Sequence, residues 1–299
     1  MPTKRIAITG ASGFVGRALA SHLTAAGHEV LALVRGEAQS AGQVAWNPGT
    51  GALDREALGA VDAVVHLAGE NVAGGRWSAA RKQRIAASRG PATEALCRAL
   101  AALPHRPAVF VGASATGIYG DRGELVLDER SPRGSGFLAD VAAAWEAGTE
   151  PARAAGMRVV NLRIGVVLDG SGGALRKMLL PFRLGLGGRL GHGRQWMSWI
   201  TRHDLVRAVS WVLAHQALPG PVLAVAPNPV RNREFTQALA RALHRPAVLP
   251  VPAFALRVLF GEMADALLSS QRAIPGALTS SGFLFEHPEI GPALRTLLG

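Results

Sequence analysis

Short apolar runs alternate with amphipathic stretches through the first two thirds of the chain. The runs are rich in Val, Ile and Leu, which is typical of strands buried on both faces of a parallel sheet. They predict strands at residues 5–9, 29–34, 63–67, 108–112 and 158–163, with a short additional strand at 43–46. The stretches between them predict helices at residues 14–26, 79–103, 137–155 and 202–215. This alternation favours a doubly wound α/β fold of the Rossmann type.

The pattern changes after about residue 165. A glycine-rich segment, 170–193, contains one amphipathic piece at 175–182. The helix at 202–215 and a strand at 222–225 are expected to return to the sheet. Beyond them, Asn232 is expected to cap one helix, and residues 253–268 are expected to form another. We therefore divide the chain into a first domain, 1–165, to which 202–226 returns, and a smaller C-terminal α/β lobe, 166–299.

Gly10, Gly13 and Gly16 lie between the first predicted strand and the first predicted helix. Glycines at this place let the backbone approach the phosphates of a dinucleotide, and the helix N-terminus offers unpaired N–H groups and a positive dipole end. A tight turn without a ligand is the alternative. The phosphate-binding loop of a nucleoside triphosphatase would require Gly-Lys-Ser/Thr after these glycines, and this sequence does not follow them. The first domain is therefore predicted to bind a dinucleotide.

The end of the second predicted strand distinguishes the two nicotinamide dinucleotides. An acidic side chain there binds the ribose hydroxyls of NAD, whereas an arginine pairs with the 2′-phosphate of NADP. Arg35 occupies this position, and Glu37 lies only in the following loop. The sequence therefore favours NADP (NADPH), with a solvated loop residue as the alternative for Arg35.

Composition and charge restrict the partners. The net charge is +11, which raises the possibility of nucleic-acid binding, but the arginines are scattered apart from one cluster at 76–84. The single cysteine, Cys97, excludes an internal disulfide and is expected in the core. The apolar stretch 248–260 contains prolines and Arg257 and is too short to span a bilayer. We expect a cytoplasmic protein with no nucleic-acid partner, no membrane partner and no metal site.

Three groups of motifs carry a family resemblance. The segment 10–16, Gly-Ala-Ser-Gly-Phe-Val-Gly, resembles the nucleotide fingerprint of the extended short-chain dehydrogenases/reductases. Residues 66–77 are similar to a signature of an atypical branch of that family, the epimerase-family (nucleoside-diphosphate-sugar epimerase-like) proteins. The segments 232–236, 261–264 and 282–285 resemble the small C-terminal domain of the same branch. The resemblance covers essentially the whole chain.

The resemblance implies a cofactor site built from several strand ends. The turn after the first strand would hold the pyrophosphate, the end of the fourth strand would line the riboses, and residues 161–165 would pass under the nicotinamide. A further motif, 199–205, resembles the junction of lobe and sheet, where Asp204 is expected to cap the next helix. The predicted cofactor-binding residues are Gly10, Ser12, Gly13, Phe14, Val15, Gly16, Arg35, Leu67, Ala68, Gly69, Glu70, Ser114 and Ile164.

The catalytic pattern of the superfamily is incomplete. Its active members use a serine or threonine, a tyrosine that transfers a proton, and a lysine four residues later that lowers the pKa of the tyrosine. Ser114 fits the serine position, but Phe137 and Val141 occupy the positions expected for tyrosine and lysine. Tyr119 is the only tyrosine of the chain, and Gly123 lies four residues after it. The usual proton relay is therefore predicted to be absent.

Two functions remain open. One is an NADP-dependent oxidoreductase or nucleotide-sugar epimerase with an altered proton donor, for which Ser114 and Tyr119 are the candidate catalytic residues. The alternative for Tyr119 is a packing role, and Glu70 is either a base or a hydrogen-bond partner of a ribose or of Arg76. The other function is a non-catalytic NADP(H)-binding sensor or partner-binding protein. The expected ligand besides the cofactor is a small molecule, with a nucleotide sugar as one candidate.

Overall fold

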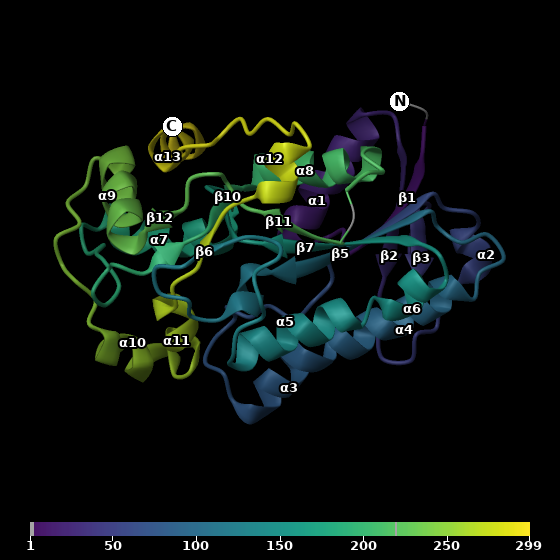
Figure 1. The fold of residues 1–299 in the computed structure, drawn as a ribbon, viewed down its shortest axis with the longest axis horizontal. Coiled ribbons are helices and arrows are strands. Elements are labelled where there is room, and N and C mark those ends of the chain that lie inside the picture. The colour runs from purple at the N-terminus through teal and green to yellow at the C-terminus, as the bar shows by residue number, and fades with distance from the viewer. Residues whose placement is uncertain (1–2, 219) are drawn as a thin grey trace.

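A computed structural model describes residues 3–218 and 220–299, and within them seven parallel strands form one sheet (Figure 1). Their order across the sheet is β11-β7-β5-β4-β1-β2-β3. The strands are β1 (Arg5–Thr9), β2 (Glu29–Val34), β3 (Gln43–Ala45), β4 (Ala63–His66), β5 (Val109–Ala115), β7 (Arg158–Ile164) and β11 (Gly220–Ala224). The chain starts near the middle of the sheet and winds outward in both directions. The predicted doubly wound α/β fold is confirmed.

Helices cover both faces of the sheet (Figure 1). On one face, α1 (Phe14–Ala25) and α8 (Arg202–Ala214) pack on a core that includes Ile6 and Ile8. On the other face, α4 (Gly90–Ala101) and α6 (Glu150–Ala154) pack on a core that includes Ala7. Successive residues of β1 thus point to opposite faces, and both faces are buried.

Three predicted helices are each divided in two by glycine or proline. The 79–103 segment forms α3 (Ala79–Ala87) and α4, with Pro91 in the first turn of α4, where its missing N–H costs no hydrogen bond. The 137–155 segment forms α5 (Phe137–Ala147) and α6, with Pro151 in the first turn of α6. The 253–268 segment forms α10 (Ala253–Phe260) and α11 (Met263–Leu268), and Gly261 between them has a φ of +60°.

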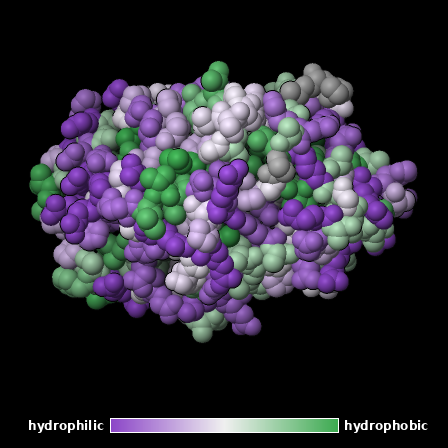
Figure 2. Space-filling view, in the orientation of Figure 1, coloured by the Kyte–Doolittle hydropathy of each residue, from purple (hydrophilic) through white to green (hydrophobic). Residues whose placement is uncertain are grey.

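The C-terminal part has its own core around the buried ring of Trp199. Short strand pairs and helices surround this core, and polar residues cover most of the face in Figure 2. The helices of this core are α7 (Gly173–Arg183), α9 (Asn232–Leu243) and α13 (Ile290–Leu298). Its strand pairs are β8 (Val166–Asp169) with β10 (Trp199–Thr201) and β9 (Trp196–Met197) with β12 (Val230–Arg231). In contrast, α12 (Gly276–Ser280) packs on the core of α1 and α8, and β6 (Val126–Leu127) with β13 (Arg272–Ala273) belongs to a small core that includes Tyr119.

Two expected helix caps are wrong. Arg231, not Asn232, precedes α9, and the Asn232 side chain accepts a hydrogen bond from the Leu190 N–H at 2.8 Å. Thr201 caps α8, because its hydroxyl oxygen accepts the Asp204 N–H at 3.1 Å. The buried Asp204 carboxylate instead accepts the N–H groups of residues 286 and 287, which fixes the C-terminal segment on α8.

Two further observations concern single features. The thiol of Cys97 is buried in the core, as predicted. In the part of the chain that the structure describes, we find no helix with the length and apolarity needed to cross a bilayer.

Candidate functional site

The glycine turn between β1 and α1 follows from close backbone packing. Gly10 has a φ of +70°, and a Cβ atom there would lie 3.0 Å from the Ala68 nitrogen. A Cβ atom on Gly16 would overlap the Gly10 carbonyl group. No side chain among the described residues caps α1 at Gly13, so the N–H groups of its first turn are available to a ligand. This is the geometry that an anion-binding turn requires.

A buried Thr9–His66 pair fixes the turn after β4. The Thr9 hydroxyl oxygen accepts the N–H groups of Leu67 (3.1 Å) and Ala68 (3.2 Å), and it lies 2.7 Å from His66 Nδ1. Because both N–H groups already donate to this oxygen, its own proton is the one that bridges to His66 Nδ1. The His66 ring then carries its proton on Nε2. Burial lowers the pKa of His66 to about 4, so the ring is neutral at physiological pH. The His66 side chain is fully buried.

Arg89 supports the next residues of the same loop. Its guanidinium donates to the Glu70 carbonyl oxygen at 3.0 Å and lies 4.8 Å above the Trp145 ring. Burial lowers the pKa of Arg89 to about 10, and the Glu70 charge opposes this shift. The Glu70 carboxylate lies 3.8 Å from Arg81, whereas Arg76 donates to the Val258 carbonyl oxygen. Sequence reasoning missed Arg89, because it placed this residue inside one continuous helix at 79–103.

The remaining predicted cofactor residues lie at the same edge of the sheet. In a parallel sheet all carboxyl ends meet at one edge, and ligands bind there. The exposed Arg35 follows the last residue of β2, and the half-buried Ile164 is the last residue of β7. Ser12 is exposed in the glycine turn, and Val15 is half-buried in the first turn of α1. That these side chains contact a cofactor stays a prediction.

Phe14 joins this edge to the C-terminal part of the chain. Cβ atoms on Gly172 and Gly173 would lie 2.6 Å and 2.8 Å from its ring, so both positions require glycine in this packing. The Arg202 guanidinium lies 4.9 Å from the same ring and pairs with Asp169 at 2.9 Å. The sequence identified this stretch only as part of a glycine-rich segment, and the contact of Gly172 and Gly173 with Phe14 was missed.

A polar network lies behind the end of β5. The Ser114 hydroxyl donates to the Glu146 carboxylate at 2.7 Å. Arg163 donates to both oxygens of that carboxylate, at 2.8 Å and 2.9 Å, and to the Tyr119 hydroxyl oxygen at 2.9 Å. The Tyr119 hydroxyl in turn donates to the Asp128 carbonyl oxygen at 2.8 Å. The two candidate catalytic residues are therefore connected through one ion pair, between the buried Arg163 and the half-buried Glu146.

Comparisons with known proteins fit this geometry. The model of the NAD dependent epimerase/dehydratase family matches residues 6–226, and a domain of unknown function (DUF1731) matches residues 251–297. An epimerase family protein of Mycobacterium bovis is 48% identical over 97% of this chain and 96% of its own length. The chain belongs to the NAD dependent epimerase/dehydratase family.

Two solved structures of relatives resemble this one. The human epimerase family protein SDR39U1, crystallised with NADPH, is 34% identical, covers 98% of this chain and 99% of its own, and has a TM-score of 0.89. A nucleoside-diphosphate sugar epimerase from Corynebacterium glutamicum is 36% identical with a TM-score of 0.83. It matches all of this chain and 59% of that longer chain. The predicted resemblance to the epimerase-family branch is confirmed.

Within this family fold, the positions expected for the tyrosine and lysine serve packing. Phe137 is the first residue of α5, and its ring meets the Trp77 ring edge-to-face at 5.2 Å. The Lys82 ammonium lies 5.5 Å from the same ring. Val141 is buried one turn later. Neither side chain at the two positions can move a proton.

The candidate catalytic residues are held by the network rather than directed at a ligand. Tyr119 is fully buried, and burial raises the pKa of its hydroxyl to about 12. Its position agrees with the packing role that the sequence left open. Ser114 is also buried, and its proton is directed at Glu146, so its oxygen is left to accept a hydrogen bond. Their catalytic roles stay predictions.

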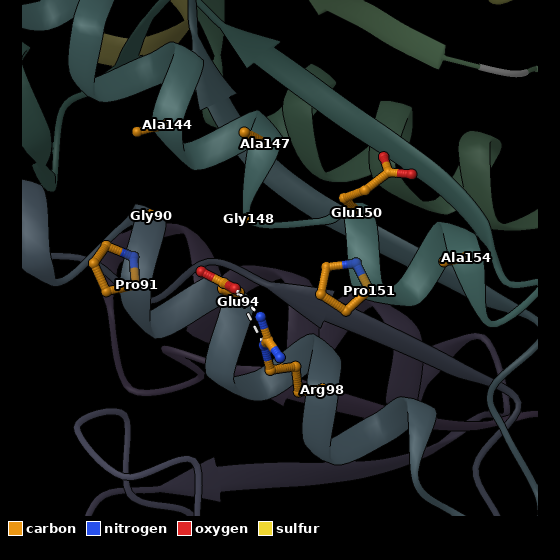
Figure 3. A pocket seen from close by; sticks show the side chains of 10 residues that line it. All are labelled: Gly90, Pro91, Glu94, Arg98, Ala144, Ala147, Gly148, Glu150, Pro151 and Ala154. Atoms are coloured by element: carbon orange, nitrogen blue, oxygen red, sulfur yellow. Dashed lines mark hydrogen bonds and ion pairs between the residues drawn. The ribbon is translucent and has the colours of Figure 1, made fainter.

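A separate groove lies between α4 and the α5–α6 pair (Figure 3). Its volume is about 550 Å³, and it shares no residue with the predicted cofactor site. The lining is mostly Ala, Gly and Pro, with Glu94 and Arg98 paired on the α4 side.

In residues 3–218 and 220–299, no group of three or more His, Cys, Asp or Glu side chains is arranged to hold a metal ion.

Proposed function

We propose that this chain binds NADPH at the carboxyl edge of its sheet and that it lacks the tyrosine–lysine proton relay. The observation that carries the proposal is the β1–α1 turn, in which Gly16 packs against the Gly10 carbonyl group and no side chain among the described residues caps the first N–H groups of α1. The human SDR39U1 structure supports it, because that relative was crystallised with NADPH.

The residues present fit this cofactor. The glycine turn would hold the pyrophosphate, and the Leu67–Gly69 loop, fixed by Thr9 and Arg89, would line the riboses. The exposed Arg35 would pair with the 2′-phosphate. When bound, NADPH supplies a hydride to an electrophilic substrate atom. A cytoplasmic location is part of the proposal, since NADPH is an intracellular cofactor.

The polar network favours the non-catalytic alternative, an NADP(H) sensor. Reduction of a carbonyl group needs a proton donor at the developing oxyanion. Ser114 directs its proton at Glu146, and the Tyr119 hydroxyl directs its proton at the Asp128 carbonyl oxygen. The oxidoreductase or epimerase alternative, with a small molecule such as a nucleotide sugar as substrate, requires Ser114 or another group to turn toward the ligand.

Cofactor binding is tested by titrating NADPH and NADH while energy transfer from the tryptophans is recorded. The Arg35→Ala variant should bind NADPH about 10- to 100-fold more weakly, because a charged hydrogen bond contributes about 1.5–3 kcal/mol. NADH affinity should change little. The matched control is Arg295→Ala, which removes an exposed arginine on α13. Failure of the wild type to bind NADPH, or equal losses for both nucleotides, would overturn the proposal.

Chemistry is tested separately by following NADPH oxidation with a panel of nucleotide sugars and small carbonyl compounds. A sensor should show no oxidation above the rate without protein. Turnover that Ser114→Ala abolishes at saturating NADPH would instead establish the enzyme alternative.

A further inference from the structure

The C-terminal part of the chain exposes a concentrated set of large apolar side chains. Twelve such side chains are exposed in the described residues, and eight of them lie in two segments, 180–186 and 248–259. We name these eight the lobe patch: Leu180, Leu184, Leu186, Val248, Leu249, Phe254, Val258 and Leu259. Their exposed fractions run from 52% to 78%, so they make little contact with the rest of the protein. Single exposed apolar residues are ordinary, but such a concentration marks an interaction surface.

The loop that follows the segment 180–186 is joined to the segment 248–259 by backbone hydrogen bonds. The Val251 N–H donates to the Arg189 carbonyl oxygen at 2.9 Å, and the Gly191 N–H donates to the Val251 carbonyl oxygen at 2.8 Å. The Arg245 side chain donates to the Arg183 carbonyl oxygen at 3.2 Å. In Figure 2, hydrophobic atoms lie at the left margin and at the lower left, among hydrophilic ones, where Figure 1 shows the loop between α9 and α10 and α10 itself. The apolar residues thus occupy one end of the molecule.

The exposed apolar residues of α7 and α10 are spaced by about one helical turn. Leu180 on α7 and Leu184, the residue that ends this helix, are four residues apart, as are Phe254 and Val258 on α10. Each pair is exposed on one side, while Leu179 and Leu256 are buried. Together, α7, α10 and the two loops beside them form an amphipathic surface.

The rim of the lobe patch is basic. The sequence has no Asp or Glu between Asp169 and Asp204, nor between Glu234 and Glu262. Basic side chains are exposed within these two intervals: Arg176, Lys177, Arg183, Arg189, Arg241, Arg245 and Arg257. Arg257 has an acidic neighbour, Asp265, at 3.3 Å. A second copy of the chain would bring the same basic rims together, which argues against self-association through this surface.

We infer that the lobe patch docks on an anionic membrane surface. Exposed aliphatic and aromatic side chains enter the boundary between headgroups and acyl chains, and arginines around them pair with anionic headgroups. Docking of this kind is peripheral and needs no spanning helix. It revises the expectation, drawn from the sequence, that the chain has no membrane partner.

The test is co-flotation of the full chain, saturated with NADPH, with lipid vesicles. One set of vesicles contains only phosphatidylcholine, and the other contains phosphatidylcholine mixed with phosphatidylglycerol. The protein should float with the anionic vesicles about tenfold or more better than with the neutral ones, and added salt should reduce this binding. Equal partition into both sets, or no flotation with either, would overturn the inference.

Variants separate the lobe patch from general stickiness. Leu249→Ser/Phe254→Ser should lower flotation about tenfold or more, because it removes two large apolar side chains from the contact. The control is Leu125→Ser/Leu284→Ser, which changes two exposed leucines outside the patch, at 60% and 77% exposure. It should float like the wild type.

NADPH titration of both double variants shows whether each is folded. If the patch variant binds NADPH normally and still floats like the wild type, the inference is wrong. It is also wrong if light scattering shows a dimer that the patch variant abolishes, since the occupant is then a second copy.

Discussion

Acidification should destabilise this protein through His66. The ring is fully buried, and burial lowers its pKa from 6.5 to about 4. In the unfolded chain the ring binds a proton near pH 6.5, so between pH 6.5 and pH 4 the unfolded state binds more protons than the folded state. Stability is therefore complete above pH 6.5 and falls as the pH drops toward 4. The full loss is about 3 kcal/mol, since each pKa unit corresponds to about 1.4 kcal/mol.

The geometry gives the charged ring no partner. Its Nδ1 faces a hydroxyl that is already donating to it, and its Nε2 has no hydrogen-bond partner among the described residues. Trp46 and Phe110 flank the ring at centroid distances of 5.8 Å and 6.0 Å. Protonation would thus place a charge in an apolar site and break the bond that holds Thr9. The loop at Leu67 depends on that bond.

Urea unfolding of the wild type and His66→Gln at pH 7.5 and pH 5 isolates this effect. At pH 5 the linkage relation gives about 2 kcal/mol of the loss. Between pH 7.5 and pH 5, the free energy of unfolding of the wild type should therefore fall by about 2 kcal/mol more than that of His66→Gln. Other titrating groups, including His22, whose pKa is lowered by burial, are present in both proteins and cancel. Equal losses in the two proteins would refute the reasoning.

Three further predictions concern other features. Arg163→Met should lower the free energy of unfolding in urea by about 3 kcal/mol, because it leaves the half-buried Glu146 carboxylate without its cation. The double variant Arg163→Met/Glu146→Leu should recover much of this loss, and a single-variant cost below about 1 kcal/mol would contradict the reasoning. The Cys97 thiol, whose pKa burial raises to about 12, should react with a disulfide reagent at pH 8 only after unfolding; rapid reaction of the native protein would contradict that placement. Gly16→Ala should abolish NADPH binding and cost about 1–3 kcal/mol, because the new methyl overlaps Gly10; unchanged affinity would show that the turn moves freely.

The sequence was sufficient to predict the sheet, because its strands are buried on both faces and their apolar runs are continuous. The predicted bounds of β1 and β2 agree with the structure, and the others differ by a few residues at their ends. The helices were less accurate, because periodicity continued across breaks that proline and glycine make. Pro91, Pro151 and Gly261 were visible in the sequence, and each stands at or next to a break between two helices.

The candidate site was predictable where neighbouring residues determine it. The glycine turn and the missing tyrosine and lysine could be read directly. The Thr9–His66 pair and the Arg163–Glu146 pair could not, because strand pairing and helix packing bring together residues distant in the sequence. Ser114 meets Arg163 only through the register of β5 on β7.

This register bears on what the edge of the sheet can do. Ser114 lies opposite Arg163 and donates to the Glu146 carboxylate, which Arg163 also binds. The Ser114 proton is therefore directed at an ionised acceptor. A carbonyl substrate brings its own acceptor and finds no donor in this hydroxyl. The parts of the edge that would bind a dinucleotide, the glycine turn and the Leu67–Ala68 loop, depend on contacts that this network does not make. The glycine turn and the Leu67–Ala68 loop therefore do not depend on the Arg163–Glu146 network, so we expect cofactor binding to persist in this sequence without proton transfer.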